Sequence, residues 1–126
     1  VANKRLGILT DIGSVTSHVE EHYAELDALI LEFNHDVALL EKCPYPGTLK
    51  SRIASNYGHF SNAQASSLLN KIRSQKLQTV VAAHLSEQSN CTELVADLLE
   101  QLLGDHPTNW LIASRHEAMP WCGVNS

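Results

Sequence analysis

The stretch Ala28–Asp36, with the sequence ALILEFNHD, decides the fold class of this chain. Its first five residues are apolar except for Glu32, a composition typical of a short strand that is buried on both faces. Asn34, His35 and Asp36 then end the strand. Strands of this kind belong to sheets that helices cover, so the stretch predicts an α/β fold with a sheet flanked by helices.

Strand and helix patterns alternate on both sides of this stretch, without an internal repeat. Arg5–Thr10 is a short apolar strand, and Ser17 with Glu20 fits a capping box for a helix that is predicted to reach about Leu26. The other predicted strands are Thr79–Ala83 and Trp110–Ala113, and the other predicted helices are a short one after Asp36, Thr48–Ser55, one that starts at Ser61 and one that ends at Gly104.

The two longest helices have the clearest patterns. Ser61 is followed three residues later by Gln64, which fits a capping box, and Asn90 with Glu93 fits another. Apolar residues recur at helical spacing in both helices and predict one buried stripe in each. The predicted stripes are Ala65, Leu68, Leu69 and Ile72 in the first helix, and Leu94, Val95, Leu98, Leu99, Leu102 and Leu103 in the second.

Composition and cysteine spacing exclude several classes of protein. Hydrophobic residues make up 44% and charged residues 18% of the 126 residues, which excludes a disordered tail. No apolar run approaches the roughly 20 residues of a membrane-spanning helix, so no membrane partner is expected. Cys43, Cys91 and Cys122 are widely spaced, which argues against a disulfide framework and a thiolate zinc site. We expect a cytoplasmic protein without a secretory leader, and the start at Val1 suggests a piece of a longer chain.

Charge is distributed unevenly along the sequence. The net charge is −5, yet the segment from Lys42 to Ser86 contains no acidic residue. A basic segment of this kind can contact a phosphate backbone even when the chain as a whole is acidic. The alternative is that its cations belong to ordinary solvated helix faces. The six basic residues are Lys42, Lys50, Arg52, Lys71, Arg73 and Lys76.

Residues that can bind metal or transfer protons come where the predicted strands stop. Asp11 follows the first strand, Glu32 closes the second and His84 follows the third, while His59 precedes the Ser61 helix. Ligands of open α/β sheets bind beyond the carboxyl ends of the strands, where the loops converge. Two histidines and two carboxylates suit a metal site or general acid catalysis. Each also has a structural alternative, as a turn residue, a buried carboxylate or a hydrogen-bonded loop histidine.

A second pattern competes for the metal. His18 to His22 fits the order H-x-x-E-H, with two histidines one helical turn apart and an adjacent glutamate. Such a pair could hold zinc, but it lies on the polar flank of the predicted helix, where a solvated face explains it equally well.

Five motifs in order resemble the metallo-β-lactamase superfamily. Within that superfamily, the match is to the branch of WalJ/YycJ-like hydrolases, which are regarded as DNA exonucleases. The resemblance extends from about Leu6 to Ala113, and the order of the motifs makes it more specific than any one of them. The motifs are Thr10-Asp11-Ile12-Gly13, Leu31-Glu32-Phe33-Asn34-His35-Asp36, Tyr45-Pro46 with Leu49-Lys50-Ser51-Arg52-Ile53, Gly58-His59-Phe60-Ser61-Asn62, and Ala83-His84-Leu85-Ser86.

The resemblance implies a metal-dependent phosphodiesterase that acts on DNA with two divalent ions, zinc or manganese. Asp11 falls on the aspartate that bridges the two ions, and His84 on a late metal-binding histidine. His59 falls on a catalytic or phosphate-contacting histidine, which Glu32 would support in proton transfer. His35 and Asp36 would belong to the wall of the site. The residues expected to contact the DNA are Asn34, Lys50, Arg52, Ser61 and Asn62.

The family's leading metal motif, His-x-His-x-Asp-His, is absent from the sequence. Residues 1–114 are therefore expected to form the C-terminal half of the family's αβ/βα sandwich, followed by an irregular tail over 115–126. Asp11 and His84 supply two ligands where a catalytic zinc normally takes three, so the chain alone is expected to bind metal weakly or not at all and to be inactive. The alternative function is a half-domain that pairs with a second copy or a partner through an apolar sheet face.

Overall fold

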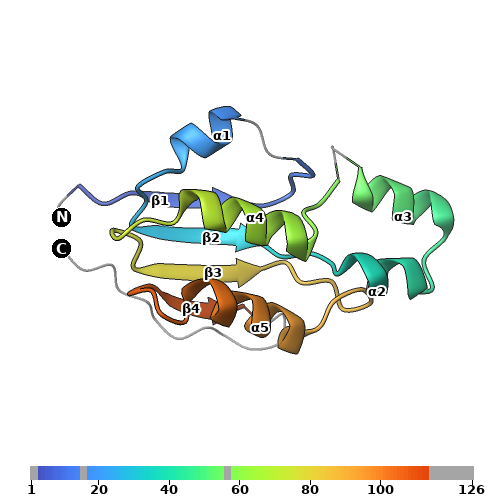
Figure 1. The fold of residues 1–126 in the computed structure, drawn as a ribbon. Coiled ribbons are helices and arrows are strands. Elements are labelled where there is room, and N and C mark those ends of the chain that lie inside the picture. Colours follow the sequence, from blue (N-terminus) through green and yellow to red (C-terminus); the bar gives the residue numbers. More distant parts are fainter. Residues whose placement is uncertain (1–2, 15–16, 56–57, 114–126) are drawn as a thin grey trace.

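A computed structural model of the chain contains one parallel sheet with the strand order β1-β2-β3-β4 (Figure 1). The structure describes residues 3–14, 17–55 and 58–113, apart from the side chains of Ser17, His18 and His22. The predicted α/β class is confirmed, while the irregular tail predicted for 115–126 lies outside the described residues. The strands are β1 (Leu6–Leu9), β2 (Ala28–Glu32), β3 (Thr79–Ala83) and β4 (Asn109–Ile112).

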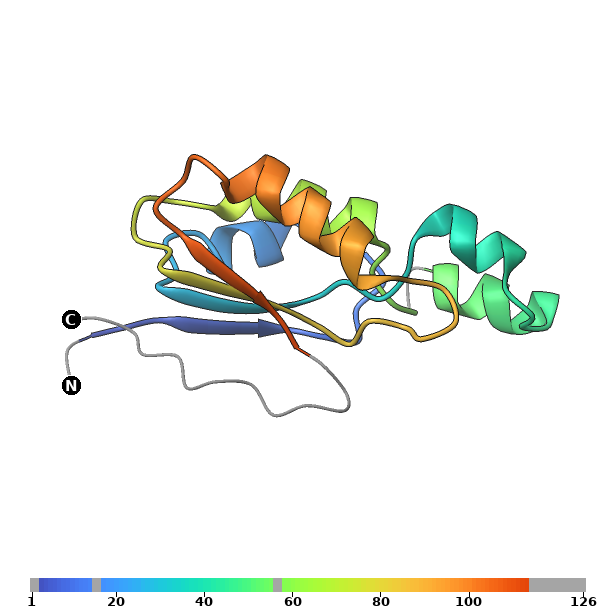
Figure 2. The same cartoon turned by 90° about the horizontal axis from the view of Figure 1, so that it is seen from below.

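The described helices divide into two groups. Figure 2 shows that α1 (Ser17–His22), α4 (Asn62–Ile72) and α5 (Thr92–Leu103) cover one face of the sheet. The short helices α2 (Val37–Lys42) and α3 (Gly47–Ala54) instead extend beyond the carboxyl ends of the strands (Figure 1). The second group therefore forms an arm at the edge of the sheet where the polar strand-end residues lie.

The core fills the space between the sheet and the helices that cover it. Alternate strand residues such as Leu29, Leu31 and Val80 point toward the helices and are almost completely buried. The predicted stripe of α4 is confirmed, because its four members are buried and the Ser61–Gln64 capping box forms. Burial of this apolar surface is the main force that fixes the sheet against α4 and α5.

Two predicted helix ends differ in the structure. The helix that starts at Ser17 ends at His22 and does not reach Leu26, because Glu25 has a φ of 59° and leaves the right-handed helical region. Leu26 is nevertheless buried beyond the helix end. The Asn90–Glu93 capping box does not form: Cys91 is the N-cap of α5 and contributes no side-chain cap.

The predicted stripe of α5 is narrower in the structure. Val95, Leu99 and Leu103 are buried, whereas Leu94 is 36% exposed and Leu98 and Leu102 are half-buried. The wide stripe would fit a helix that is covered on two sides. In the described part of the chain, α5 packs against α4 and β4, and its opposite side is exposed.

No described helix covers the second face of the sheet (Figure 2). Leu6 and Ile8 of β1 alternate with the buried Gly7 and Leu9, and they are 61% and 55% exposed. Ile30 of β2 is half-buried on the same face. The sequence predicted that β2 is covered on both faces. The described helices cover it on one face only.

Candidate metal centre at the carboxyl ends of the strands

Four side chains from separate segments meet at the carboxyl edge of the sheet. Asp11 follows β1, Glu32 closes β2, His84 follows β3, and His59 precedes α4. Because neighbouring parallel strands end at the same edge, residues that are far apart in sequence come together here. The structure thus brings together the four residues that were predicted to share one site.

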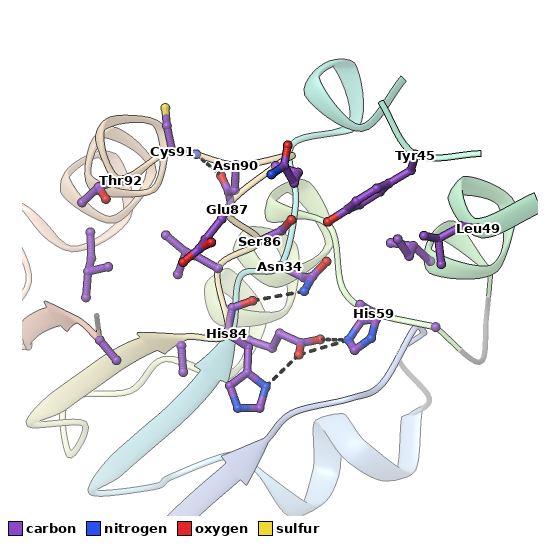
Figure 3. Close-up of a pocket in the computed structure, with 18 of the residues that line it drawn as sticks. Asn34, Tyr45, Leu49, His59, His84, Ser86, Glu87, Asn90, Cys91 and Thr92 are labelled. Atoms are coloured by element: carbon purple, nitrogen blue, oxygen red, sulfur yellow. Dashed lines mark hydrogen bonds and ion pairs between the residues drawn. The ribbon is translucent and has the colours of Figure 1, made fainter. Parts of the chain in front are cut away.

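Glu32 is the centre of this cluster. Its side chain is completely buried, and its Oε1 lies 3.1 Å from the Nδ1 of His84. Its two carboxylate oxygens lie 3.1 Å and 3.2 Å from the Nδ1 of His59, and its Oε2 accepts a hydrogen bond from the backbone N–H of Phe60 at 3.3 Å (Figure 3). One buried carboxylate therefore holds two imidazole rings and the backbone that precedes α4.

This arrangement sets which nitrogen of each ring faces the carboxylate. With Glu32 as the acceptor, the Nδ1 atoms of His59 and His84 are the donors. In a neutral ring, the proton on Nδ1 leaves a lone pair on Nε2. A carboxylate that holds one ring nitrogen of a histidine while the other binds metal is a common arrangement in metal sites.

Asp11 completes the cluster from the side of β1. Its Oδ1 lies 3.4 Å from the Nδ1 of His59 and 3.9 Å from the Nδ1 of His84, and 68% of its side chain is exposed. Asp11, Glu32 and His59 each offer one ligand atom within 4.8 Å of the others. Carboxylate oxygens and imidazole nitrogens are donors that zinc and manganese accept, so the residues present fit a divalent ion.

The backbone of two site residues is strained. Asp11 and His84 have φ values of 60° and 58°, in the left-handed region that residues with a Cβ rarely occupy. The amide of Asn34 donates a hydrogen bond to the carbonyl of His84 at 3.1 Å and holds this conformation in place. Such strain costs about 1–3 kcal/mol per residue and concentrates at functional sites.

His35 and Asp36 lie behind the cluster. His35 is 2% exposed, and its Nδ1 lies 3.2 Å from the Oδ1 of Asn34. Burial lowers the pKa of His35 below its ordinary value, and the neighbouring His59 lowers it further, while Glu32 and Asp36 act in the opposite direction. Asp36 caps α2 by accepting a hydrogen bond from Leu39 N–H at 3.0 Å. Both residues therefore support the site from inside the fold.

A groove of about 1200 Å³ opens from this cluster. One wall comes from the α2–α3 arm and includes Tyr45 and Arg52, and the other comes from the loop between β3 and α5. Asn34 and Arg52, two of the residues that were predicted to contact substrate, line this groove. Tyr45 was not among the predicted site residues, although the order Pro44-Tyr45-Pro46 already indicated a rigid turn.

The other predicted substrate contacts have their side chains elsewhere. The Ser61 hydroxyl caps α4 by accepting a hydrogen bond from Gln64 N–H at 3.1 Å. Asn62 is buried and exchanges two amide hydrogen bonds with Asn90, at 2.8 Å and 2.9 Å. The Lys50 ammonium donates to the carbonyl of Glu41 at 2.6 Å. These contacts give the three side chains structural roles, and none of the three lines the groove.

The basic segment does not form one continuous surface, which corrects the expectation that it binds DNA as a unit. Lys42, Lys50 and Arg52 lie in the α2–α3 arm, beyond the carboxyl ends of the strands. The other three basic residues lie in the last turn of α4 and in the turn that leads into β3, at the amino ends of the strands (Figure 1).

The cations at the amino ends of the strands are engaged within the fold. Lys71 is 3.0 Å from Glu20, and Lys76 is 3.5 Å from Glu25. Arg73 donates to the carbonyl of Leu102. They therefore match the alternative of ordinary helix and turn cations, and only the arm places basic side chains near the groove.

The competing zinc pair stays a prediction, because the structure does not describe the side chains of His18 and His22. Among the described residues, no helix combines the length and the apolar character that crossing a membrane requires.

Comparisons with known proteins identify relatives of the chain. No family model matches the chain. The chain is 32% identical over 101 residues to exodeoxyribonuclease YycJ of Bacillus anthracis, a match that covers 80% of the chain and 38% of that protein. It is also 32% identical over 92 residues to exodeoxyribonuclease WalJ of Streptococcus pneumoniae, which covers 73% of the chain and 34% of that protein.

The solved structure of the metallo-β-lactamase fold protein YhfI from Bacillus subtilis is also similar. It aligns with 81% of this chain and 34% of its own, with a TM-score of 0.50 and 15% sequence identity. The chain thus spans little more than a third of the length of the relatives that it matches. Over that span, it is a homologue of the bacterial exodeoxyribonucleases YycJ and WalJ and has part of the metallo-β-lactamase fold.

Proposed function

We propose that the chain carries one part of the active site of a metal-dependent exodeoxyribonuclease, which hydrolyses phosphodiester bonds in DNA. The observation that carries this proposal is the buried Glu32 carboxylate, which holds His59 and His84 beside Asp11 at the carboxyl edge of the sheet. The names of the homologous proteins support DNA as the substrate. The part of the metallo-β-lactamase fold that the chain shares with YhfI supports the use of divalent metal ions.

In this proposal, Asp11 and His84 hold divalent ions. His84 binds through Nε2, because its Nδ1–H is directed at Glu32. Divalent ions bound here would lower the pKa of a water and polarise the phosphoryl group. Two protein ligands are one fewer than a catalytic zinc normally takes. We infer that the remaining ligands come from the part of the homologous domain that this chain does not span.

His59 and Glu32 act as a proton-transfer pair in this proposal. Glu32 accepts a hydrogen bond from the Nδ1–H of His59, which fixes the orientation of the ring. His59 is 36% exposed at the floor of the groove, so its Nε2 can reach a substrate. In this position, His59 would donate a proton to the leaving oxygen of the phosphodiester or stabilise the charge that develops on it.

The test compares variants of the full-length protein that contains this chain. Asp11→Asn and His84→Ala should each reduce the metal-dependent release of nucleotides from end-labelled DNA by about 100-fold or more. Both variants should also bind less metal, measured by elemental analysis after dialysis. Glu41→Gln is the matched control, because Glu41 is an exposed carboxylate on α2 that does not line the groove. Full activity of either site variant would refute the proposed assignment.

A second candidate function is pairing through the sheet. Leu6 and Ile8 expose apolar side chains on the face that no described helix covers. Apolar surface of this kind marks association sites in soluble proteins. In this alternative, the chain acts as a half-domain that pairs with a second copy of itself or with the complementary half of the fold.

A further inference from the structure

The groove beside the metal centre has two chemically different walls. The wall formed by the α2–α3 arm contains the aromatic ring of Tyr45, the apolar side chains of Leu49 and Ile53, and the guanidinium of Arg52. The facing wall, between β3 and α5, is mainly polar and includes Ser86, the carboxylate of Glu87 and Thr92 (Figure 3). An aromatic ring next to a cation is the combination with which proteins bind single-stranded nucleic acids.

Tyr45 is held rigidly in this wall. It lies between Pro44 and Pro46, which restrict the backbone on both sides, and Pro46 is the N-cap of α3. Figure 3 shows the ring of Tyr45 reaching from the α2–α3 connection toward the middle of the groove. A ring that is already positioned loses little conformational freedom when a ligand stacks on it.

Arg52 adds a positive charge to the same wall. It is exposed in α3 and lines the groove, and its guanidinium has no hydrogen bond or ion pair with another described residue. Lys50, in the same helix, is engaged with the carbonyl of Glu41. Of the three basic residues of the arm, Arg52 is the one that lines the groove, where its guanidinium can bind a phosphate.

We propose that this wall binds the terminal nucleotide of a DNA strand, with its base stacked on Tyr45 and a phosphate on Arg52. This inference rests on the proposed nuclease function. The groove starts at His59 and His84, so a base on Tyr45 places the adjoining phosphodiester toward the cluster. Every base has an aromatic face that can stack on the Tyr45 ring, so the wall accepts all four bases. An unpaired strand end leaves this face free, so the wall selects such an end.

The experiment measures binding by the full-length protein in EDTA, where cleavage does not interfere. Fluorescence anisotropy gives the Kd of a single-stranded oligonucleotide and of matched oligonucleotides that lack the base at the 5′ or the 3′ terminus. Wild-type protein should bind one of the abasic strands about 5- to 100-fold more weakly than the intact strand, as expected for the loss of one stacked base. Tyr45→Leu should bind the intact strand and that abasic strand equally.

Two control variants separate stacking from folding and from charge. Tyr45→Phe keeps the ring and should preserve the wild-type difference between intact and abasic strands. Arg52→Ala should weaken the binding of all strands by a similar factor and reduce the salt dependence of log Kd by about one phosphate contact. Lys76→Ala, at the other end of the sheet, should change neither the Kd values of the strands nor their salt dependence.

The possible failures point to different conclusions. If the wild-type protein discriminates between the strands and Tyr45→Leu discriminates equally well, Tyr45 does not stack on the terminal base. If the wild-type protein binds intact and abasic strands equally, the groove does not bind the terminal base, while the nuclease function stands. If the wild-type protein binds no DNA at all in EDTA, the terminal-nucleotide site is ruled out, and the cleavage assay with metal decides the nuclease function separately.

Discussion

Glu32 couples two histidines that have different proposed tasks. It accepts a hydrogen bond from both His59 and His84, so a change at this one position should disturb the proposed proton transfer and metal binding together. Its complete burial means that water cannot replace the lost acceptor. Glu32 thus joins the two histidine rings to the buried interior of the fold.

We expect Glu32→Gln to lower the nuclease activity of the full-length protein by about 10- to 100-fold, because the carboxylate orients both rings. The Gln amide would face N–H donors with an N–H of its own, which should cost about 1–3 kcal/mol of unfolding free energy. End-labelled DNA cleavage and urea denaturation measure the two effects. Glu41→Gln should leave both unchanged, and a fully active Glu32→Gln variant would contradict the coupling.

His35 should make the stability of the chain depend on pH. Its pKa is lowered in the folded state, so the unfolded state binds a proton first as the pH falls. The free energy of unfolding should be at its maximum above the ordinary histidine pKa of about 6.5 and should decrease as the pH falls from there toward 5. Urea denaturation across this range should give a shallower decrease for His35→Gln, and equal slopes would contradict the role of His35.

The sequence predicted the residues of the cluster because strand ends can be recognised locally. Asp11, Glu32 and His84 each follow an apolar run, and parallel strands bring their ends to one edge. The environment of Asn62 could not be predicted in the same way. Its partner Asn90 is distant in sequence, and the pairing depends on how α4 and α5 approach each other.

At the scale of elements, the connection between α3 and α4 positions His59. The His59 N–H donates to the carbonyl of Ile53 at 3.0 Å, and the neighbouring Gly58 is buried against the end of α3. A Cβ on Gly58 would lie 2.3 Å from the carbonyl oxygens of both Arg52 and Ile53. The absence of a side chain at Gly58 therefore allows α3 to pack close to the loop that carries His59.

We expect Gly58→Ala to destabilise the chain by about 1–3 kcal/mol, because backbone atoms must move to accommodate the methyl group. Gly47→Ala is the matched control, since a Cβ at Gly47 has no neighbouring atom within 4 Å. This control should change the unfolding free energy by less than about 0.5 kcal/mol. Urea denaturation gives the unfolding free energy of both variants. Equal changes would show that the backbone around Gly58 moves at little energetic cost.

The sequence predicted the existence of the helices better than their ends and contacts. Local spacing identified α4 and its cap, because both partners of that cap are three residues apart. The same rule failed at Asn90, whose amide is used by Asn62, Cys91 N–H and the carbonyl of Phe33. A local motif cannot reveal that a distant residue competes for the same hydrogen-bonding group.

At the scale of the whole molecule, the described helices cover one face of the sheet, and Leu6 and Ile8 of β1 are exposed on the other. We expect the isolated chain to self-associate through Leu6 and Ile8, because their burial removes apolar surface from water. Light scattering across a concentration series should give a mass above 13.9 kDa, and Ile8→Lys should restore the monomer.

The control for association is Val37→Lys. Val37 is 52% exposed on α2, away from the sheet, so its replacement should leave the self-association of the chain unchanged. A monomeric wild-type chain at all concentrations would rule out pairing between copies. It would leave the complementary half of the fold as the partner of this face.

The parallel pairing of all four strands also affects how the chain reaches its native state. No two of the four described strands form a hairpin, and the central pair joins Ala28 to Thr79, which are about fifty residues apart in sequence. Such distant pairings require long loops to close before their contacts stabilise the chain, and this slows folding. Refolding of this small chain should therefore be slower than that of helical proteins of the same length, with unpaired strand edges exposed to aggregation in the meantime.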